Sequence, residues 1–204
     1  MTKPKIALTL ILCALLLQGC SSSSLNSAKN RVAISGLSFY LGFHSSPVMY
    51  VKRGYAYSDL GGVKNRQRAI SDYNTAIMIS PRYAFAYQAR GVSRALLGDY
   101  KLAIEDFNQC IRIAPLMGGC YRNRGWVHSE YLKDYEAGLV DSNLSVRYLP
   151  RDPVSYANRA ENLFMLGIFP ESCANFRKAF ELGYSLSETW TNDKVKRFAS
   201  DCKS

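Results

Sequence analysis

The sequence predicts an all-α protein in which pairs of helices repeat along the chain. A tyrosine, two variable residues, an arginine and a small residue recur in that order four times, at Tyr50–Gly54, Tyr87–Gly91, Tyr121–Gly125 and Tyr156–Ala160. Successive tyrosines are 37, 34 and 35 residues apart, a period typical of stacked helical repeats. Each motif is followed by apolar and small residues at helical spacing, and a proline ends the second helix of the first three copies.

The uneven period is explained by two insertions between the paired helices. The first copy has three extra residues and the third has one, and without them all three intervals become 34. The insertion in the first copy predicts a loop over residues 61–68, which carries Lys64, Arg66 and Arg68. A solvated loop is favoured there over a contact with an anionic glycan or an acidic protein. The fourth copy ends at Gly183 instead of a proline.

The second copy shows most plainly which known repeat these copies resemble. Its motif is followed by Leu97, Gly98, Tyr100, Ala103, Phe107 and Pro115, an order that resembles the tetratricopeptide repeat. The resemblance implies a right-handed α-solenoid of four repeats, at about residues 47–81, 82–115, 116–150 and 151–184. Residues 185–204 are expected to form a capping helix, with Ser185 and Glu188 spaced as a capping box and Trp190, Val195 and Phe198 on its apolar face.

The four motif arginines allow two interpretations. They could form a row of ligand-binding cations, or each could pair with an acid on the following helix. Asp72, Asp106 and Asp141 occupy one fixed place in the second helices of the first three copies, which favours buried pairs with Arg53, Arg90 and Arg124. Asn175 takes that place in the fourth copy, so Arg159 is the arginine predicted to lack an acidic partner.

The amino terminus predicts export and lipidation. Lys3 and Lys5 precede an apolar run that is too short to span a bilayer, as in a signal peptide covering residues 1–19. The segment 17–20 resembles the bacterial lipobox, which implies that Cys20 receives a diacylglycerol thioether and becomes the first mature residue. An ordinary signal cleavage or an uncleaved anchor is the alternative. Because Ser21 is not acidic, the resemblance to lipoproteins places the chain on the periplasmic face of the outer membrane.

Residues 20–46 are expected to link this anchor to the repeats. The polar stretch to about Arg31 reads as a flexible tether. The apolar segment from Val32 to His44 is expected to pack on the first repeat as an amino-terminal cap, with a peripheral membrane contact as the alternative.

Cysteine usage fits an oxidising compartment. Once Cys13 leaves with the signal peptide and Cys20 is lipidated, four cysteines remain, and proximity in the sequence favours the pairs Cys110–Cys120 and Cys173–Cys202. Reduced core cysteines are the alternative. We expect no metal and no cofactor, because the spacings do not suit zinc and the chain has only two histidines.

The resemblance also implies where a partner would bind. In tetratricopeptide proteins the first helices line an inner groove, and the residue after each motif's small residue faces it. The predicted partner-binding residues are Tyr55, Gln88, Val92, Arg122, Trp126, Glu130, Glu161 and Phe164. Trp126 and Arg122 are expected to contribute most. The alternative is that Trp126 only fills space between helices. Asn123 and Asn158 lack the flanking lysines of a carboxylate clamp, so an extended or helical peptide held by apolar contacts is expected.

The net charge and the motifs of the sequence favour some classes of function over others. The net charge of +10 favours an acidic partner or an anionic envelope surface, while the predicted export argues against nucleic acid. No catalytic motif is present, so an enzyme is not expected. The sequence predicts a lipid-anchored scaffold for envelope proteins or peptides, such as an adaptor for peptidoglycan enzymes. A pilotin-like factor for a secretin and direct binding of cell-wall glycan are the alternatives.

Overall fold

The computed structural model describes residues 22–42, 45–185 and 193–202, and within them it contains helices and connecting loops but no strand. The helices are α2 (Ser22–Leu41), α3 (Pro47–Asp59), α4 (Val63–Ile79), α5 (Ala84–Ala95), α6 (Tyr100–Ile113), α7 (Gly118–Trp126), α8 (Tyr135–Tyr148), α9 (Pro153–Met165), α10 (Phe169–Glu181) and α11 (Asp193–Asp201). A π-helical turn, η1 (Val127–Tyr131), extends α7. The predicted all-α solenoid is confirmed, and each predicted repeat range holds one helix pair: α3–α4, α5–α6, α7–α8 and α9–α10.

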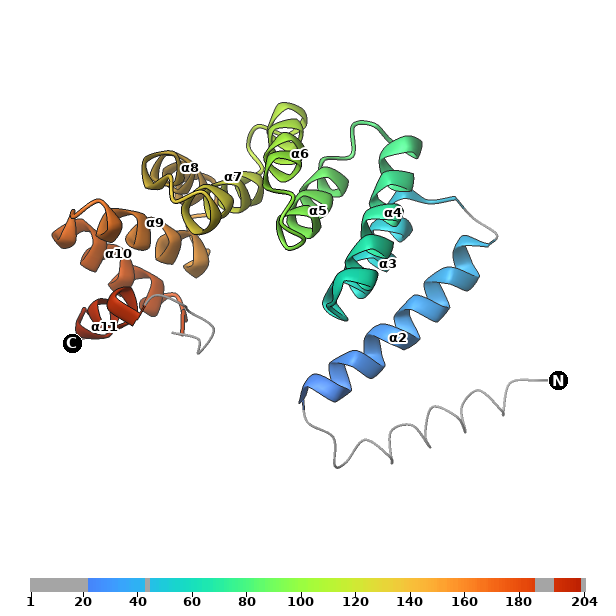
Figure 1. Ribbon diagram of the computed structural model, residues 1–204, viewed down its shortest axis with the longest axis horizontal. Helices are drawn as coiled ribbons and strands as arrows, with labels where there is room; N and C mark the ends of the chain where they lie inside the picture. The colour runs from blue at the N-terminus through green and yellow to red at the C-terminus, as the bar shows by residue number, and fades with distance from the viewer. Residues whose placement is uncertain (1–21, 43–44, 186–192, 203–204) are drawn as a thin grey trace.

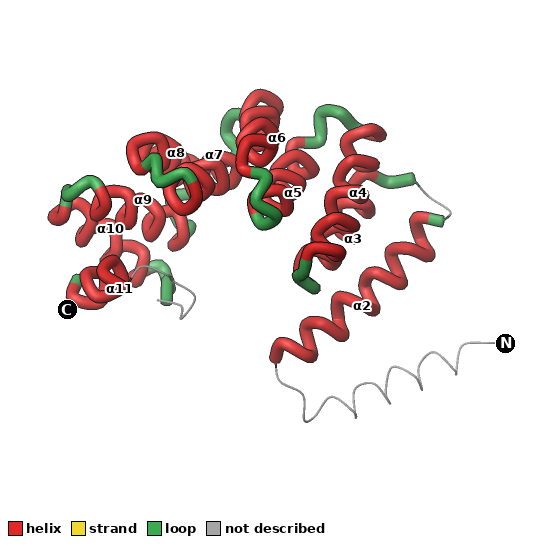
Figure 2. The backbone as a smooth tube through the Cα atoms, viewed as in Figure 1, coloured by secondary structure: helices red, strands yellow, loops and turns green. Residues whose placement is uncertain are grey.

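The pairs stack into an arc, with α2 beside the first pair and α11 beside the last (Figure 1; Figure 2). Consecutive first helices, namely α3, α5, α7 and α9, contact one another along the stack. In the described residues, consecutive second helices stand farther apart. A curved stack brings its inner elements closest together, so the first helices form the inner layer and the second helices the outer one.

The repeat motif's small residue makes this packing possible. Tyr73, Phe107 and Phe176, one from each of three second helices, are fully buried. Phe107 lies against Gly91, where an added Cβ would come within 2.7 Å of the ring. In the third repeat Gly125 instead meets Asp141, whose Cβ would be 2.9 Å from an added one. A larger residue at these positions would push the paired helices apart.

The third repeat accommodates its predicted extra residue in an unusual way. The turns of the other repeats place Gly61, Gly98 and Gly167 in the left-handed region, with φ of 68°, 89° and 77°. In the third repeat the π-helical turn absorbs one residue, with the Leu132 amide donating to the Val127 carbonyl at 3.2 Å. The left-handed position therefore moves one residue along and falls on Lys133, with φ of 56°.

Two expectations about loops were wrong. Residues 63–68 are not an inserted loop, because α4 begins at Val63 and is 17 residues long against 14 in α6. The three extra residues thus lengthen a helix by nearly one turn. The expected flexible tether is helical from Ser22, and α2 packs along α3, where Arg53 donates to the Ser38 hydroxyl at 3.2 Å.

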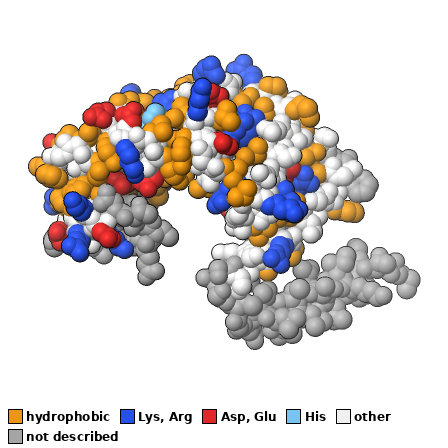
Figure 3. Space-filling model, in the orientation of Figure 1, with side chains coloured by type: hydrophobic (Ala, Val, Ile, Leu, Met, Phe, Trp, Pro, Cys, Tyr) orange, Lys and Arg blue, Asp and Glu red, His pale blue; other side chains and the backbone are white. Residues whose placement is uncertain are grey.

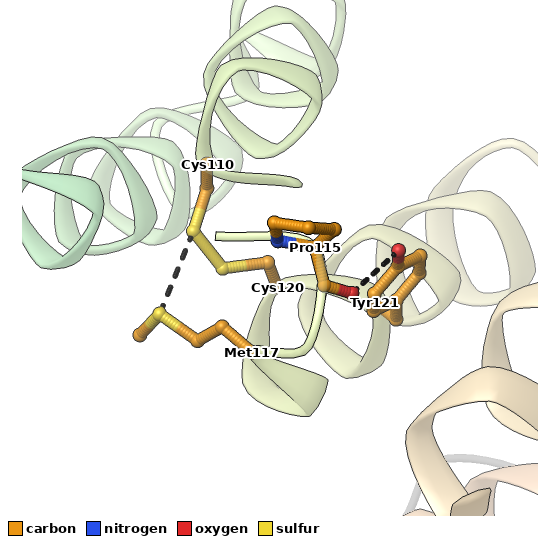
Figure 4. Close-up of a disulfide and its surroundings, with 5 residues drawn as sticks. All are labelled: Cys110, Pro115, Met117, Cys120 and Tyr121. Atoms are coloured by element: carbon orange, nitrogen blue, oxygen red, sulfur yellow. Dashed lines mark hydrogen bonds between the residues drawn. A yellow bond between two sulfur atoms is a disulfide. The ribbon is translucent and has the colours of Figure 1, made fainter. Parts of the chain in front are cut away.

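Both expected disulfides are present. Cys110–Cys120 joins the end of α6 to α7, with Cα atoms 6.2 Å apart, and the Met117 sulfur lies 3.8 Å from Cys110 Sγ (Figure 4). Cys173–Cys202 joins α10 to α11, with Cα atoms 5.2 Å apart. Val195 and Ala199 of α11 are buried against the last repeat, as a capping helix requires.

Several sequence predictions concern residues outside the described part of the chain. These are the signal peptide, Cys20, Phe43, His44, Glu188 and Trp190. Among the described residues, the helices fall short of the length and apolar character that a membrane span needs.

Candidate interaction groove

The motif arginines are structural in the first three repeats. Two nitrogens of each guanidinium donate hydrogen bonds to the carboxylate of the paired aspartate. The shortest nitrogen–oxygen distance is 2.6 Å in each of the pairs Arg53–Asp72, Arg90–Asp106 and Arg124–Asp141. The predicted pairs are therefore confirmed. All three aspartates are buried, so the bridges hold the two helices of a repeat together from inside.

The same arginines also tie neighbouring repeats together. Arg90 donates to Asn74 of the first repeat at 2.7 Å, and Arg124 donates to Asn108 of the second at 2.5 Å. Each motif tyrosine lies under its own arginine, with the guanidinium carbon 5.5 Å from the Tyr87 ring centroid in the second repeat. The Tyr87 hydroxyl donates to the Pro81 carbonyl at 3.1 Å, which closes the link to the preceding repeat.

The fourth repeat departs from this pattern, as the sequence predicts. Arg159 donates through Nε to the Asn175 side-chain oxygen at 2.7 Å, and no carboxylate pairs with it in the described residues. Burial lowers the pKa of Arg159 below its ordinary value, with Tyr156 opposing the shift. The Asn175 side-chain nitrogen donates to the Glu171 carbonyl at 2.7 Å, so this asparagine accepts from Arg159 and donates to the backbone of its own helix.

The predicted groove residues lie on the inner layer, where the amino-terminal half is apolar. Tyr55 of α3 is 42% exposed, with its ring edge-on to Tyr73 at 5.9 Å. Gln88 and Val92 lie on one face of α5 and are half-buried. Gln88 fits against Gly119 of the next repeat, where an added Cβ would meet its amide nitrogen at 2.6 Å.

Trp126 is the last residue of α7 and lies half-buried against the second repeat. It packs against the buried cluster of Ala95, Ala103, Phe107 and Val127, and the Tyr131 ring meets it edge-on with centroids 5.1 Å apart. Tyr131 in turn stacks on Tyr100 at 4.5 Å. These contacts give Trp126 the space-filling role that the sequence left as an alternative, while its half-exposed surface stays available to a partner.

Arg122 has an intramolecular partner. It donates to the Asp152 carboxylate at 3.0 Å, and the same oxygen accepts the Ser155 amide at 2.9 Å as the N-cap of α9. The pair is only partly buried, so it joins the third and fourth repeats through a solvent-screened bridge.

The carboxy-terminal half of the groove carries acidic groups. Burial raises the pKa of Glu161 to about 7, with the charge of Glu130 adding to the rise and Lys133 opposing it. Glu161 in turn contributes to the raised pKa of Tyr184, for which burial is the main cause. The sequence places Glu130 and Glu161 in the groove, and the structure brings them close enough to interact across the third and fourth repeats.

Phe164 lies under the carboxy-terminal cap. Its ring is 4.8 Å from Phe198 of α11 and 5.5 Å from Phe169, which are both apolar neighbours. Phe164 is therefore part of the core that α11 closes.

Comparisons with known proteins identify the fold. The tetratricopeptide repeat model matches residues 86–115, which is the second repeat. TTC0263, a thermophilic TPR protein of Thermus thermophilus, superposes with a TM-score of 0.67 at 15% identity, over 86% of this chain and 91% of that one. This chain has the tetratricopeptide-repeat fold.

Other solved structures show the same likeness. MamA of Desulfovibrio magneticus RS-1 gives a TM-score of 0.62 at 17% identity, over 80% of this chain and 96% of that one. The Cut9–Hcn1 hetero-tetramer of the APC/C gives 0.70 at 15% identity, over 86% of this chain and 33% of that one. No curated protein matches the chain by sequence. Identities this low show the TPR fold alone.

The TPR inner layer also exposes apolar residues that sequence reasoning missed. Phe85 is 51% exposed and Leu96 is 40% exposed, and both lie on the face of α5 that carries Gln88 and Val92. Their spacings of three and four residues from that pair were the available signal. Tyr83 lies 5.9 Å from Phe85, which extends the aromatic surface toward α3.

This arrangement suits the binding of a peptide. The described residues hold no cluster of His, Cys, Asp and Glu that could bind a metal. A TPR surface with an apolar end and an acidic end can hold a peptide and fix its direction.

Proposed function

We propose that this chain is a scaffold that binds partner proteins or peptides of the cell envelope through the inner layer of its TPR stack. The observation that carries the proposal is the row of exposed apolar side chains, Tyr55, Phe85 and Leu96, on the inner layer of the stack. The TPR fold generally serves protein–protein interaction, and aromatic residues in a concave surface are common sources of binding energy.

The two halves of the groove define the partner's chemistry. Apolar side chains would enter the end formed by α3 and α5, whereas a basic or amide group would lie near Glu130 and Glu161. An apolar segment with a positively charged end fits this surface best. This differs from the acidic partner suggested by net charge, because Glu130 and Glu161 lie in the groove and its Arg122 is already paired with Asp152.

Site-specific photo-crosslinking in cells tests the groove. A photo-reactive phenylalanine at Phe85 or Leu96 is expected to capture a partner, since both side chains are exposed on the inner layer. The matched control is Met78 on α4, which is 75% exposed on the outer layer. Equal adducts at Met78 and Phe85 would rule out the groove as the specific surface.

The identity of the captured protein separates the functional alternatives. Peptidoglycan hydrolases or a protease indicate an adaptor, and a secretin subunit indicates a pilotin-like factor. If no protein is captured and the chain sediments with purified peptidoglycan, the scaffold proposal is wrong and glycan binding replaces it.

We also propose that the chain is anchored by a lipid on Cys20, on the periplasmic face of the outer membrane. The lipobox-like segment at residues 17–20 supports this. Cys20→Ala is expected to release the protein into the soluble periplasmic fraction, because alanine has no thiol to carry the acyl chains on which stable anchoring depends. Continued fractionation with outer membranes would contradict the proposal.

A further inference from the structure

A polar cleft lies between α2 and the first repeat, away from the groove. Its volume is about 430 Å³. Helix α2 contributes Ser27, Arg31, Ile34 and Ser35, while the first repeat contributes Tyr57, Leu60, Asn65 and Arg68. Neither the predicted disulfides nor the proposed partner surface uses any of these residues.

The cleft brings together hydrogen-bond donors with positive charge. Arg31 comes from α2 and Arg68 from α4, so two basic residues line the cleft from two elements. The lining contains no acidic residue, and neither arginine forms an ion pair within the described residues. Arg68 lies over the Tyr57 ring at 5.7 Å, which holds its guanidinium at the cleft.

The remaining polar groups also favour an anion. The side-chain nitrogen of Asn65 donates to the Gly61 carbonyl at 3.0 Å, so the other side-chain donors of the residues that line the cleft are the two guanidiniums and the hydroxyls of Ser27, Ser35 and Tyr57. A hydroxyl and a guanidinium can both donate to one oxyanion.

The amino-terminal end of the chain is its most basic part. Residues 22–81 contain seven Lys and Arg against two Asp, a net charge of +5 out of the +10 of the whole sequence. Figure 3 shows Lys and Arg side chains spread over the amino-terminal half of the visible face. This field would raise the local concentration of anions around the cleft.

We propose that this cleft binds a phosphate group. Guanidiniums from two sides match a tetrahedral anion with several exposed oxygens, and the volume leaves room for a small substituent on the phosphate. The phosphate could belong to a phospholipid headgroup or to a soluble phosphorylated compound. If Cys20 is lipidated, Arg31 lies only about 14 Å along α2 from its first residue, within reach of headgroups.

Two probes distinguish these sources on the purified full chain. Glycerol 1-phosphate represents a soluble phosphate ester, and monomeric dihexanoylphosphatidylglycerol represents a lipid headgroup. Binding is followed by calorimetry and by the NMR signals of the arginine Nε–H groups, in a detergent without phosphate. Saturable shifts of the Arg31 and Arg68 signals are expected.

Charge-neutral variants supply the decisive comparison. Arg31→Gln and Arg68→Gln are each expected to weaken binding about tenfold, because each removes a charge-assisted hydrogen bond. Both side chains are exposed, so the fold should persist, which circular dichroism can verify. Arg82→Gln is the matched control, since it removes an exposed charge outside the cleft.

Each outcome decides between named possibilities. Binding of both probes supports a soluble phosphate ester, and binding of the lipid alone supports a headgroup site. If neither probe saturates, the proposal is overturned, and the same holds if Arg82→Gln weakens binding as much as the two cleft variants do. The concave groove is untouched by these variants, so crosslinking at Phe85 would fail or succeed independently.

Discussion

The buried carboxylate of Asp106 makes the strongest case for a large effect from one substitution. It accepts Arg90 at 2.6 and 3.0 Å and Arg94 at 2.8 Å, and its side chain is only 3% exposed. Asp106→Asn keeps the shape but leaves two guanidiniums without their counter-charge. Within the described residues Asp72 accepts one arginine only, so Asp72→Asn is the natural comparison.

The expected magnitude follows from burial. Removing one partner of a buried ion pair costs about 3–5 kcal/mol. Both arginines keep some exposure, at 16% and 19%, and asparagine retains one acceptor oxygen, so we expect about 3 kcal/mol for Asp106→Asn. With a single arginine to leave unpaired, Asp72→Asn should cost about 2 kcal/mol.

Urea unfolding followed by far-UV circular dichroism measures both losses. Because repeat stacks can unfold in stages, the slope against urea must stay unchanged for the comparison to hold. The double variant Asp106→Asn with Arg94→Gln should lose at least about 1 kcal/mol less stability than the two single variants lose in sum, because the two residues are coupled. A cost under about 1 kcal/mol for Asp106→Asn, or a larger cost for Asp72→Asn than for Asp106→Asn, would contradict a buried charge left unpaired.

Three further predictions concern other parts of the stack. Because burial raises the pKa of Glu161 to about 7 from an ordinary 4.5, the native state binds this proton more tightly than the unfolded state. This group's contribution to stability should therefore fall as pH rises from about 4.5 to 7, by on the order of 2 kcal/mol after solvent screening, and Glu161→Gln should flatten the urea-midpoint profile against pH. An unchanged profile would show that Glu161 titrates normally. Lys133→Gly should raise the free energy of unfolding by about 0.5–1 kcal/mol, since it relieves a left-handed lysine but frees the unfolded chain; a loss of stability in the same urea assay would contradict this. Replacing Cys173 and Cys202 by Ala should cost about 3 kcal/mol by loop entropy and speed amide exchange in α11, and unchanged exchange would show that packing alone holds this helix.

The sequence predicted the features that repeat. Four copies of one motif fixed the helix pairs, and the spacing of Arg90 and Asp106 was enough to infer a bridge. The same comparison singled out Arg159, because Asn175 breaks an otherwise regular pattern. Regular spacing carries this information because equivalent positions in stacked repeats share one environment.

Features that occur once were harder to foresee. The extra residues of the first repeat lengthen α4, since Val63 and Lys64 can continue a helix as readily as a loop. Arg94 joins Asp106 as a second cation, which no other repeat anticipates. Phe164 faces the cap because α11 folds back onto the last repeat, a contact that depends on tertiary structure.

The sequence predicted only some of the exposed residues of the groove, because exposure also depends on how far along its helix a residue lies. The sequence identified the face of α5 that carries Gln88 and Val92, yet burial of each side chain depends on the neighbouring repeat. Phe85 and Leu96 lie near the helix ends, where fewer neighbours cover them. Their exposure is therefore a property of the stack rather than of the local sequence.

The affinity of the captured partner for two alanine variants tests the central claim most directly. Phe85→Ala and Met78→Ala each remove an exposed apolar side chain, one from the inner layer and one from the outer. By calorimetry, Phe85→Ala should weaken binding at least about tenfold, while Met78→Ala should leave it unchanged. Equal affinities for the two variants would contradict binding through the inner layer.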